Sequence, residues 1–241
     1  MMSEKSITSG QLNLPGVVEA EGTDRIASVF DLTPEEVERL KGVKPKLLGL
    51  RCGRTNCAEG LHCFDRSRVR PHYKQGACQQ CGAELIDWGQ VWSRESRDIE
   101  KKFEFFQNEW IRHFFFHVPI TGRIEKYARR FGQVGLAEVL EKQLRQNKML
   151  RYIPALDGRQ TKMLDGTIVH WARHAVGCCC RGCMSYWHNI PLDHELTGSD
   201  IAYLKGLALK FIVKRMPDLA SEAVRKLPRA AMLSDRTSRA N

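Results

Sequence analysis

The sequence predicts a mainly α-helical protein with a small N-terminal module of short β hairpins and a helical C-terminal module, both rich in cysteine. Two observations lead to this fold class. After residue 96, apolar residues recur at spacings of three and four, the period of a helix with one buried face. The nine cysteines fall into two groups, within residues 52–81 and 178–183. Each group therefore marks a compact module that needs its own chemical explanation.

The composition is that of an ordinary globular chain with an excess of basic residues. Of its 241 residues, 42% are hydrophobic and 27% are charged, and no apolar run is long enough to span a bilayer. The first residues lack the apolar core of a secretory signal, so we expect a cytoplasmic protein with reduced thiols. The net charge of +10 and pI near 9.3 favour nucleic acid as a partner, although a merely basic protein has the same composition.

The N-terminal segment, residues 1–46, is predicted to contain one short helix in DLTPEEVERLKG. Thr33 is the expected N-cap, Pro34 takes the first helical position and Glu36 completes a capping box. Gly42 supplies the stop. The module that follows, residues 47–92, closes with GAELIDWGQVW, which we interpret as strand-like.

Helices are predicted for most of the remaining chain. In the middle region, residues 93–150, one helix runs from about Ser96 to Val118, and two more cover roughly 123–131 and 136–150. Within residues 151–217, the second cysteine group precedes a final helix that has Thr197 or Ser199 as its N-cap and Pro217 at its end. Residues 218–241 form a basic tail.

The first cysteine group has the spacing of a zinc ribbon. Two cysteines in CQQCG can bind one ion if the chain turns sharply between them, and Gly82 tolerates the backbone angle that such a knuckle needs. A structural zinc site takes four ligands in two pairs, so the partner pair comes from Cys52, Cys57 and Cys63, with His62 as a further donor. One cysteine of the group is spare, and the sequence does not identify it. The group comprises Cys52, Cys57, Cys63, Cys78 and Cys81.

The loop inside this group is a candidate nucleic-acid contact. Residues 51–74 contain six arginines and lysines against two acidic residues. Arginine forks suit phosphate oxygens, and an aromatic ring can stack on a base. The candidate residues are Arg66, Arg68, Arg70, Tyr73 and Lys74. An ordinary solvated loop on a basic protein explains the pattern equally well.

The second cysteine group, in HAVGCCCRGCMSYWHNIP, predicts a second metal site. The spacing from Cys180 through Cys183 to His188 is that of a zinc knuckle, with His174 or Cys179 as the fourth ligand. In one continuous helix, however, His188 would lie about 12 Å along the axis from Cys180. A shared site with His188 therefore requires a break in the helix, and Gly182 within C-R-G-C offers one. Thiols packed as small hydrophobic groups are the alternative.

Residues 157–216 resemble a small bacterial family known as a domain of unknown function, DUF 4186. The family pattern contains DGKQT-P, HATATCCRGCLxKWHGIP and ELT, and its H-x4-CC-RGC-x4-H core stands in this chain. The resemblance implies that two of the three adjacent cysteines are functional, because Cys178 replaces a threonine of the pattern. It implies no activity. The matched positions are Gln160, Thr161, His174, Cys179, Cys180, Arg181, Gly182, Cys183, Trp187, His188 and Pro191.

Taken together, these features predict a zinc-binding protein with two structural metal sites that binds nucleic acid. Histidines near the second group favour zinc over an iron–sulfur cluster, which prefers four thiolates. One alternative is a metal-dependent, hydrolase-like enzyme acting on nucleic acid or nucleotides, with a pocket lined by Gln160, Thr161, Arg181 and Trp187. The other is an adaptor that docks a protein partner. The oligomeric state is left open.

Overall fold

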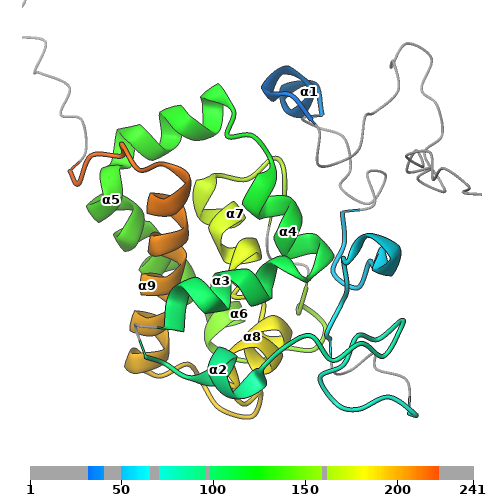
Figure 1. Cartoon of the computed structure of the whole chain (residues 1–241). Helices are drawn as coiled ribbons and strands as arrows, with labels where there is room; N and C mark the ends of the chain where they lie inside the picture. The colour runs from blue at the N-terminus through cyan, green and yellow to red at the C-terminus, as the bar shows by residue number, and fades with distance from the viewer. Residues whose placement is uncertain (1–31, 41–49, 66–70, 96–97, 159–161, 223–241) are drawn as a thin grey trace, which may run out of the picture.

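The protein is mainly helical in a computed structural model that describes residues 32–40, 50–65, 71–95, 98–158 and 162–222 (Figure 1). Residues 1–31, Gly42 and most of the basic tail lie outside these ranges. In the described part, no helix is both long and apolar enough to cross a membrane. The helices are α1 (Pro34–Arg39), the 3-10 turn η1 (Cys57–Glu59), α2 (Trp88–Trp92), α3 (Ile99–Gln107), α4 (Trp110–His117), α5 (Gly122–Leu144), α6 (Asn147–Leu150), α7 (Ile168–Ala175), α8 (Arg181–His188) and α9 (Gly198–Arg215).

Helix α7 lies at the centre of the core, where it packs against α4, α5 and α9 (Figure 1). Its sequence is consistent with this position, because Ile168, Val169, Trp171 and Ala172 form a broad apolar face. All four of these side chains are buried. The segment that carries the first cysteine group lies against the junction of α3 and α4.

The predicted caps of α1 and α9 are confirmed. Thr33 and Glu36 form a reciprocal capping box with Pro34 at the first position of α1. Thr197 caps α9 through an equivalent box with Asp200, and the helix ends at Arg215, ahead of Pro217. These ends follow from residues within four positions of one another, which is why a linear pattern could place them.

The single helix predicted from Ser96 to Val118 is wrong, because the chain breaks it into α3 and α4. The break lies at Asn108 and Glu109, whose backbone pairs with His62. The His62 amide donates to the Asn108 carbonyl at 2.8 Å, and the Trp110 amide donates to the His62 carbonyl at 2.9 Å. Hydrogen bonds to a distant segment thus replace those that would have continued the helix.

Helix α5 merges the two helical segments that we predicted for residues 123–131 and 136–150 across a kink at Gly132. It ends at Leu144, short of the predicted end, and residues 147–150 form the separate helix α6. Gly132 adopts φ 63° and ψ 178°, which only glycine adopts readily. The kink frees amides from the helical ladder. The Gln133 amide donates to the Ala220 carbonyl at 3.0 Å, and the Val134 amide to the Ser221 carbonyl at 2.9 Å. The chain after α9 therefore caps the second half of α5.

The expected β hairpins of a zinc ribbon are not found among the described residues. Their pairing there is limited to isolated bridges, between Asn56 and Leu61 and between His62 and Glu109. Within the stretch that we interpreted as strand-like, residues 82–92, the last five residues form α2, which Asp87 caps by accepting from the Gln90 amide. The indole N–H groups of Trp88 and Trp92 donate to the carbonyls of Gly76 and Tyr186. Packing of both tryptophans selects a helix over a strand here.

Candidate metal sites

Four side chains from the first cysteine group converge on one point, which we call site 1: Cys57, His62, Cys78 and Cys81. Their ligand atoms all lie within 4.8 Å of one another. The sulfurs of Cys57 and Cys78 are 3.8 Å apart, and the Cys81 sulfur is 3.4 Å from Nδ1 of His62. These four residues could hold a metal ion.

A tight turn presents Cys78 and Cys81 to the same point. The Gly82 amide donates to the Cys78 carbonyl at 2.9 Å, and the Gln80 amide lies 3.4 Å from the Cys78 sulfur. Burial alone would raise the pKa of the Cys78 thiol, but backbone amides of Cys63, Cys81 and Gln80 lower it overall. Gly82 has φ 76°, and a Cβ there would meet the Tyr73 ring at 2.7 Å. The predicted role of Gly82 in the knuckle is consistent with this geometry.

Cys63 is the cysteine of the first group that joins neither site. It is buried, and burial beside Glu109 raises the pKa of its thiol. Its carbonyl instead accepts from the Gln79 amide at 2.9 Å. His62, which the sequence offered as a further donor, takes the place in site 1 that Cys52 or Cys63 was expected to fill.

Cys52 lies away from site 1 and meets Cys179 and Cys183 in a second group, which we call site 2. The ligand atoms of these three cysteines also lie within 4.8 Å of one another. The sulfurs of Cys179 and Cys183 are 3.4 Å apart. Site 2 therefore joins the N-terminal module to the start of α8, a link that the separate treatment of the two cysteine groups missed.

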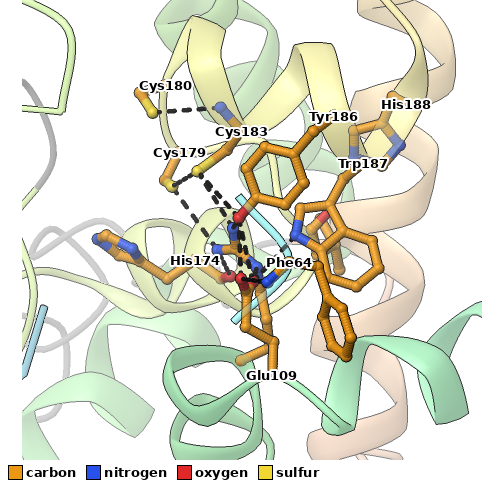
Figure 2. A network of polar contacts seen from close by, with 11 residues as sticks. Phe64, Glu109, His174, Cys179, Cys180, Cys183, Tyr186, Trp187 and His188 are labelled. Carbon is orange, nitrogen blue, oxygen red and sulfur yellow. Dashed lines mark hydrogen bonds and ion pairs between the residues drawn. The ribbon is translucent and has the colours of Figure 1, made fainter. Parts of the chain in front are cut away.

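Cys180 lies at the edge of site 2. It is the N-cap of α8, and its sulfur is 3.5 Å from the Cys183 amide (Figure 2). Thiol contacts from Cys180, Cys183 and Cys52 hold the pKa of Cys179 well below its usual range. The same contacts raise the pKa of Cys180, whose thiol interacts with Cys179 and Cys183. Cys178 is buried and stands outside the group, as the resemblance implied.

A buried polar network borders site 2 (Figure 2). The guanidinium of Arg112 is fully buried, and its Nη2 lies 3.1 Å from the Cys183 sulfur. Its Nε forms an ion pair with Glu109 at 3.0 Å. Glu109 also accepts from the Tyr186 hydroxyl and the Trp187 indole, both at 3.0 Å. Sequence reasoning missed these residues, although the arginine and glutamate interrupting an apolar helix were a usable signal.

The two histidines predicted as ligands lie outside site 2. His188 is at the far end of α8, where Nε2 donates to the Val176 carbonyl at 2.8 Å and Nδ1 lies 3.3 Å from the Tyr203 hydroxyl. The helix is continuous from Arg181 to His188, so the break needed to bring His188 to the thiols does not occur. His174 is buried and stacks on Phe115, and neither of its ring nitrogens has a hydrogen-bond partner.

The described members of the predicted pocket do not line one. Arg181 is fully buried and donates to the carbonyls of Pro191 and His194, at 2.6 and 2.8 Å, and thereby anchors the loop after α8. Trp187 is fully buried between Phe64, Trp88 and Phe106. Gln160 and Thr161 lie outside the described residues.

Two of the predicted nucleic-acid contacts lie on the surface of site 1. Tyr73 covers the knuckle, and its hydroxyl donates to the Gln80 carbonyl at 3.3 Å. Lys74 is exposed and pairs with Glu84 at 2.6 Å. Arg66, Arg68 and Arg70 lie outside the described residues.

The fold and its clusters thus define a helical protein with Cys/His groups that could bind metal. Residues 100–213 match the sequence model of a family described as Domain of unknown function (DUF4186). The match confirms the resemblance and starts earlier than expected, since it includes α4 and α5 and nearly all of α3. Cys52 and all of site 1 precede it. No solved structure matches the chain.

Proposed function

We propose that this is an intracellular zinc protein with two structural zinc ions, one within the N-terminal module and one that joins this module to a helical domain, and that it binds nucleic acid. The convergence of ligand atoms at two separate points carries the proposal. Zinc–thiolate bonds of about 2.3 Å place two sulfurs of a tetrahedral site about 3.8 Å apart. The sulfurs of Cys57 and Cys78 are 3.8 Å apart.

The surroundings of the sites favour a structural role over catalysis. A catalytic zinc keeps one coordination position open to water or substrate. Site 1 offers four protein ligands, and the thiols of Cys179 and Cys183 in site 2 are buried. Arg181 and Trp187, which an enzyme would have needed at a pocket, serve the packing of α8 instead.

Support for nucleic-acid binding comes from charge. The net charge of +10 is large for a chain of this length, and such a surface attracts phosphate backbones. Tyr73 and Lys74 lie on the surface of site 1, close in sequence to the basic loop with Arg66, Arg68 and Arg70. Together these side chains could contact phosphates.

Metal analysis of the purified full-length protein tests the first half of the proposal. We expect two equivalents of zinc per chain and no iron. Protein that is colourless and metal-free after purification without chelators, or brown and iron-loaded, would contradict it.

Retention on single-stranded and duplex DNA and on RNA, measured across a salt series, tests the second half. Binding through phosphate contacts should weaken steeply with salt. Reversing the charges of Arg66, Arg68 and Arg70 to glutamate should flatten that slope. The matched control reverses Lys126, Arg130 and Lys142, whose positions on α5 are exposed, and should retain the slope. A complete absence of binding would favour the protein-adaptor alternative.

A further inference from the structure

We propose that site 2 is a four-thiolate zinc centre made of Cys52, Cys179, Cys180 and Cys183, with the buried Arg112 guanidinium donating hydrogen bonds to two of its sulfurs. This inference rests on the proposed zinc function and names the ligands and neighbours of one ion. It makes Cys52, which precedes the family-matched segment, the residue that fastens the N-terminal module to α8.

Cys180 is the fourth ligand that the geometry supports. It stands three positions before Cys183, the spacing at which two cysteines bind one ion across a turn. Its sulfur lies 3.5 Å from the Cys183 amide, beside the group formed by Cys52, Cys179 and Cys183. Figure 2 shows the sulfurs of Cys179, Cys180 and Cys183 gathered at the first turn of α8. The amides at this helix end favour negative charge.

Buried charges around the site require an anion. Arg112 and Arg173 are both buried, and Glu109 is the buried carboxylate that pairs with one of them. Arg173 donates to Gln143 and to the carbonyls of Cys178 and Cys179, and no carboxylate pairs with it in the described part of the chain. A buried cation without an anion is costly. A divalent ion with four thiolates is itself anionic and offsets this positive charge.

The compactness of the group favours one ion over an iron–sulfur cluster of four irons. In such a cluster each thiolate binds its own iron, which keeps the sulfurs well apart. Here the sulfurs of Cys179 and Cys183 are 3.4 Å apart, close to the spacing of about 3.8 Å around a single tetrahedral zinc. Arg112 lies 3.7 and 3.1 Å from these same two sulfurs, where N–H groups can stabilise the thiolates.

Zinc stoichiometry in single variants of the full-length protein tests the ligand set. Cys52→Ser and Cys180→Ser should each retain one equivalent of zinc where the wild type retains two. Cys178→Ser and His174→Ala, at buried neighbours outside the proposed ligand set, should retain two. If His174→Ala loses an equivalent and Cys180→Ser does not, the four-thiolate proposal is wrong while the two-zinc function stands. A wild type without zinc would instead overturn the proposed function.

X-ray absorption at the zinc edge tests the same ligand set in the wild-type protein. Because it needs no substitution, the result does not depend on whether a variant folds. Cys57, Cys78 and Cys81 and the four thiolates of site 2 should supply sulfur, with His62 as the single nitrogen ligand. A spectrum with equal sulfur and nitrogen counts, or with an oxygen ligand from water, would overturn the proposed coordination of site 2.

Discussion

Arg112 lies on the largely apolar helix α4, where its guanidinium contacts polar groups from several other segments. It contacts Glu109, the Tyr186 hydroxyl and two sulfurs of site 2, and it also donates to the His174 carbonyl. An arginine in this position serves as an outer partner of the proposed metal centre, because its planar fork can reach thiolate and carboxylate together.

Replacing Arg112 with methionine should lower the free energy of unfolding of the zinc-loaded protein by about 3–5 kcal/mol, because Glu109 is left buried without its cation. Urea unfolding at fixed zinc concentration measures the change. The double variant Arg112→Met with Glu109→Gln should lose less free energy of unfolding than the single variant, because it no longer buries the unpaired Glu109 carboxylate. A single variant as stable as the wild type would show that the ion pair contributes nothing.

His188 gives the protein a pH-dependent stability. Burial lowers its pKa from the ordinary 6.5 to about 3, so the folded state keeps the imidazole neutral while the unfolded chain binds a proton below pH 6.5. Stability is therefore fully present above pH 6.5 and is lost as the pH falls toward 3, by about 1.4 kcal/mol per pH unit at most.

The His188→Gln variant should be less stable than the wild type at pH 7.5, because it loses the fit to Val176 and Tyr203, but its stability should fall less steeply between pH 6.5 and 5. His117→Gln, at an exposed histidine of α4, is the control and should keep the wild-type slope. Unfolding curves at several pH values measure both. Equal slopes in the wild type and His188→Gln would refute the assignment.

At the scale of elements, a few positions determine where the helices end and bend. Asn108 and Glu109 leave the helical ladder to pair with His62, and this same break turns Glu109 toward Tyr186 and Trp187. The kink at Gly132 lets α5 follow the core and exposes amides that Ala220 and Ser221 cap. A periodic pattern locates such helices but not their bends, because the bends depend on partners far away in sequence.

Gly132→Ala should destabilise the protein by about 1–3 kcal/mol, since alanine must adopt a backbone conformation that glycine alone tolerates. Gly206→Ala is the matched control: it lies within α9, and an added Cβ meets nothing within 4 Å. That variant should gain about 0.5–1 kcal/mol. Thermal unfolding compares the stabilities of the two variants. A more stable Gly132→Ala variant would show that residue 132 does not need a conformation reserved for glycine.

At the scale of the whole molecule, the proposed ion of site 1 crosslinks the N-terminal module internally, and the proposed ion of site 2 fastens that module to the helical domain. His62 in site 1 pairs through its backbone with Glu109, and Glu109 pairs with Arg112 beside site 2. A continuous chain of contacts thus joins the sites, so we expect loss of one ion to weaken the other.

Removal of zinc should strongly destabilise the intact protein. Structural zinc contributes about 10–16 kcal/mol at pH 7, as much as the whole stability of about 5–15 kcal/mol of a typical protein. Chelator-treated protein should therefore show a lower melting temperature and faster thiol modification, both reversed by added zinc. An unchanged melting temperature after complete removal of metal would refute the structural role of the ions.

The sequence alone determined the features that depend on neighbouring residues. The capping box at Thr33 and the knuckle at Cys78 and Cys81 follow from spacings of two to four positions, and Thr197 was one of the two predicted N-caps of α9. The family resemblance was also recognisable from a short motif. The same motif led us to expect His188 as a ligand, which the continuous helix α8 places outside site 2.

Only the tertiary structure decided how the cysteines are shared between the two sites. Cys52 and Cys179 are more than a hundred residues apart, and nothing local distinguishes Cys52 from Cys57 or Cys63. Their assignment depends on how the loop around His62 pairs with the α3–α4 junction, which turns one cysteine toward α8 and others toward the knuckle. The physical reason is that a metal site selects ligands by distance in space, which depends on the packing of the whole chain.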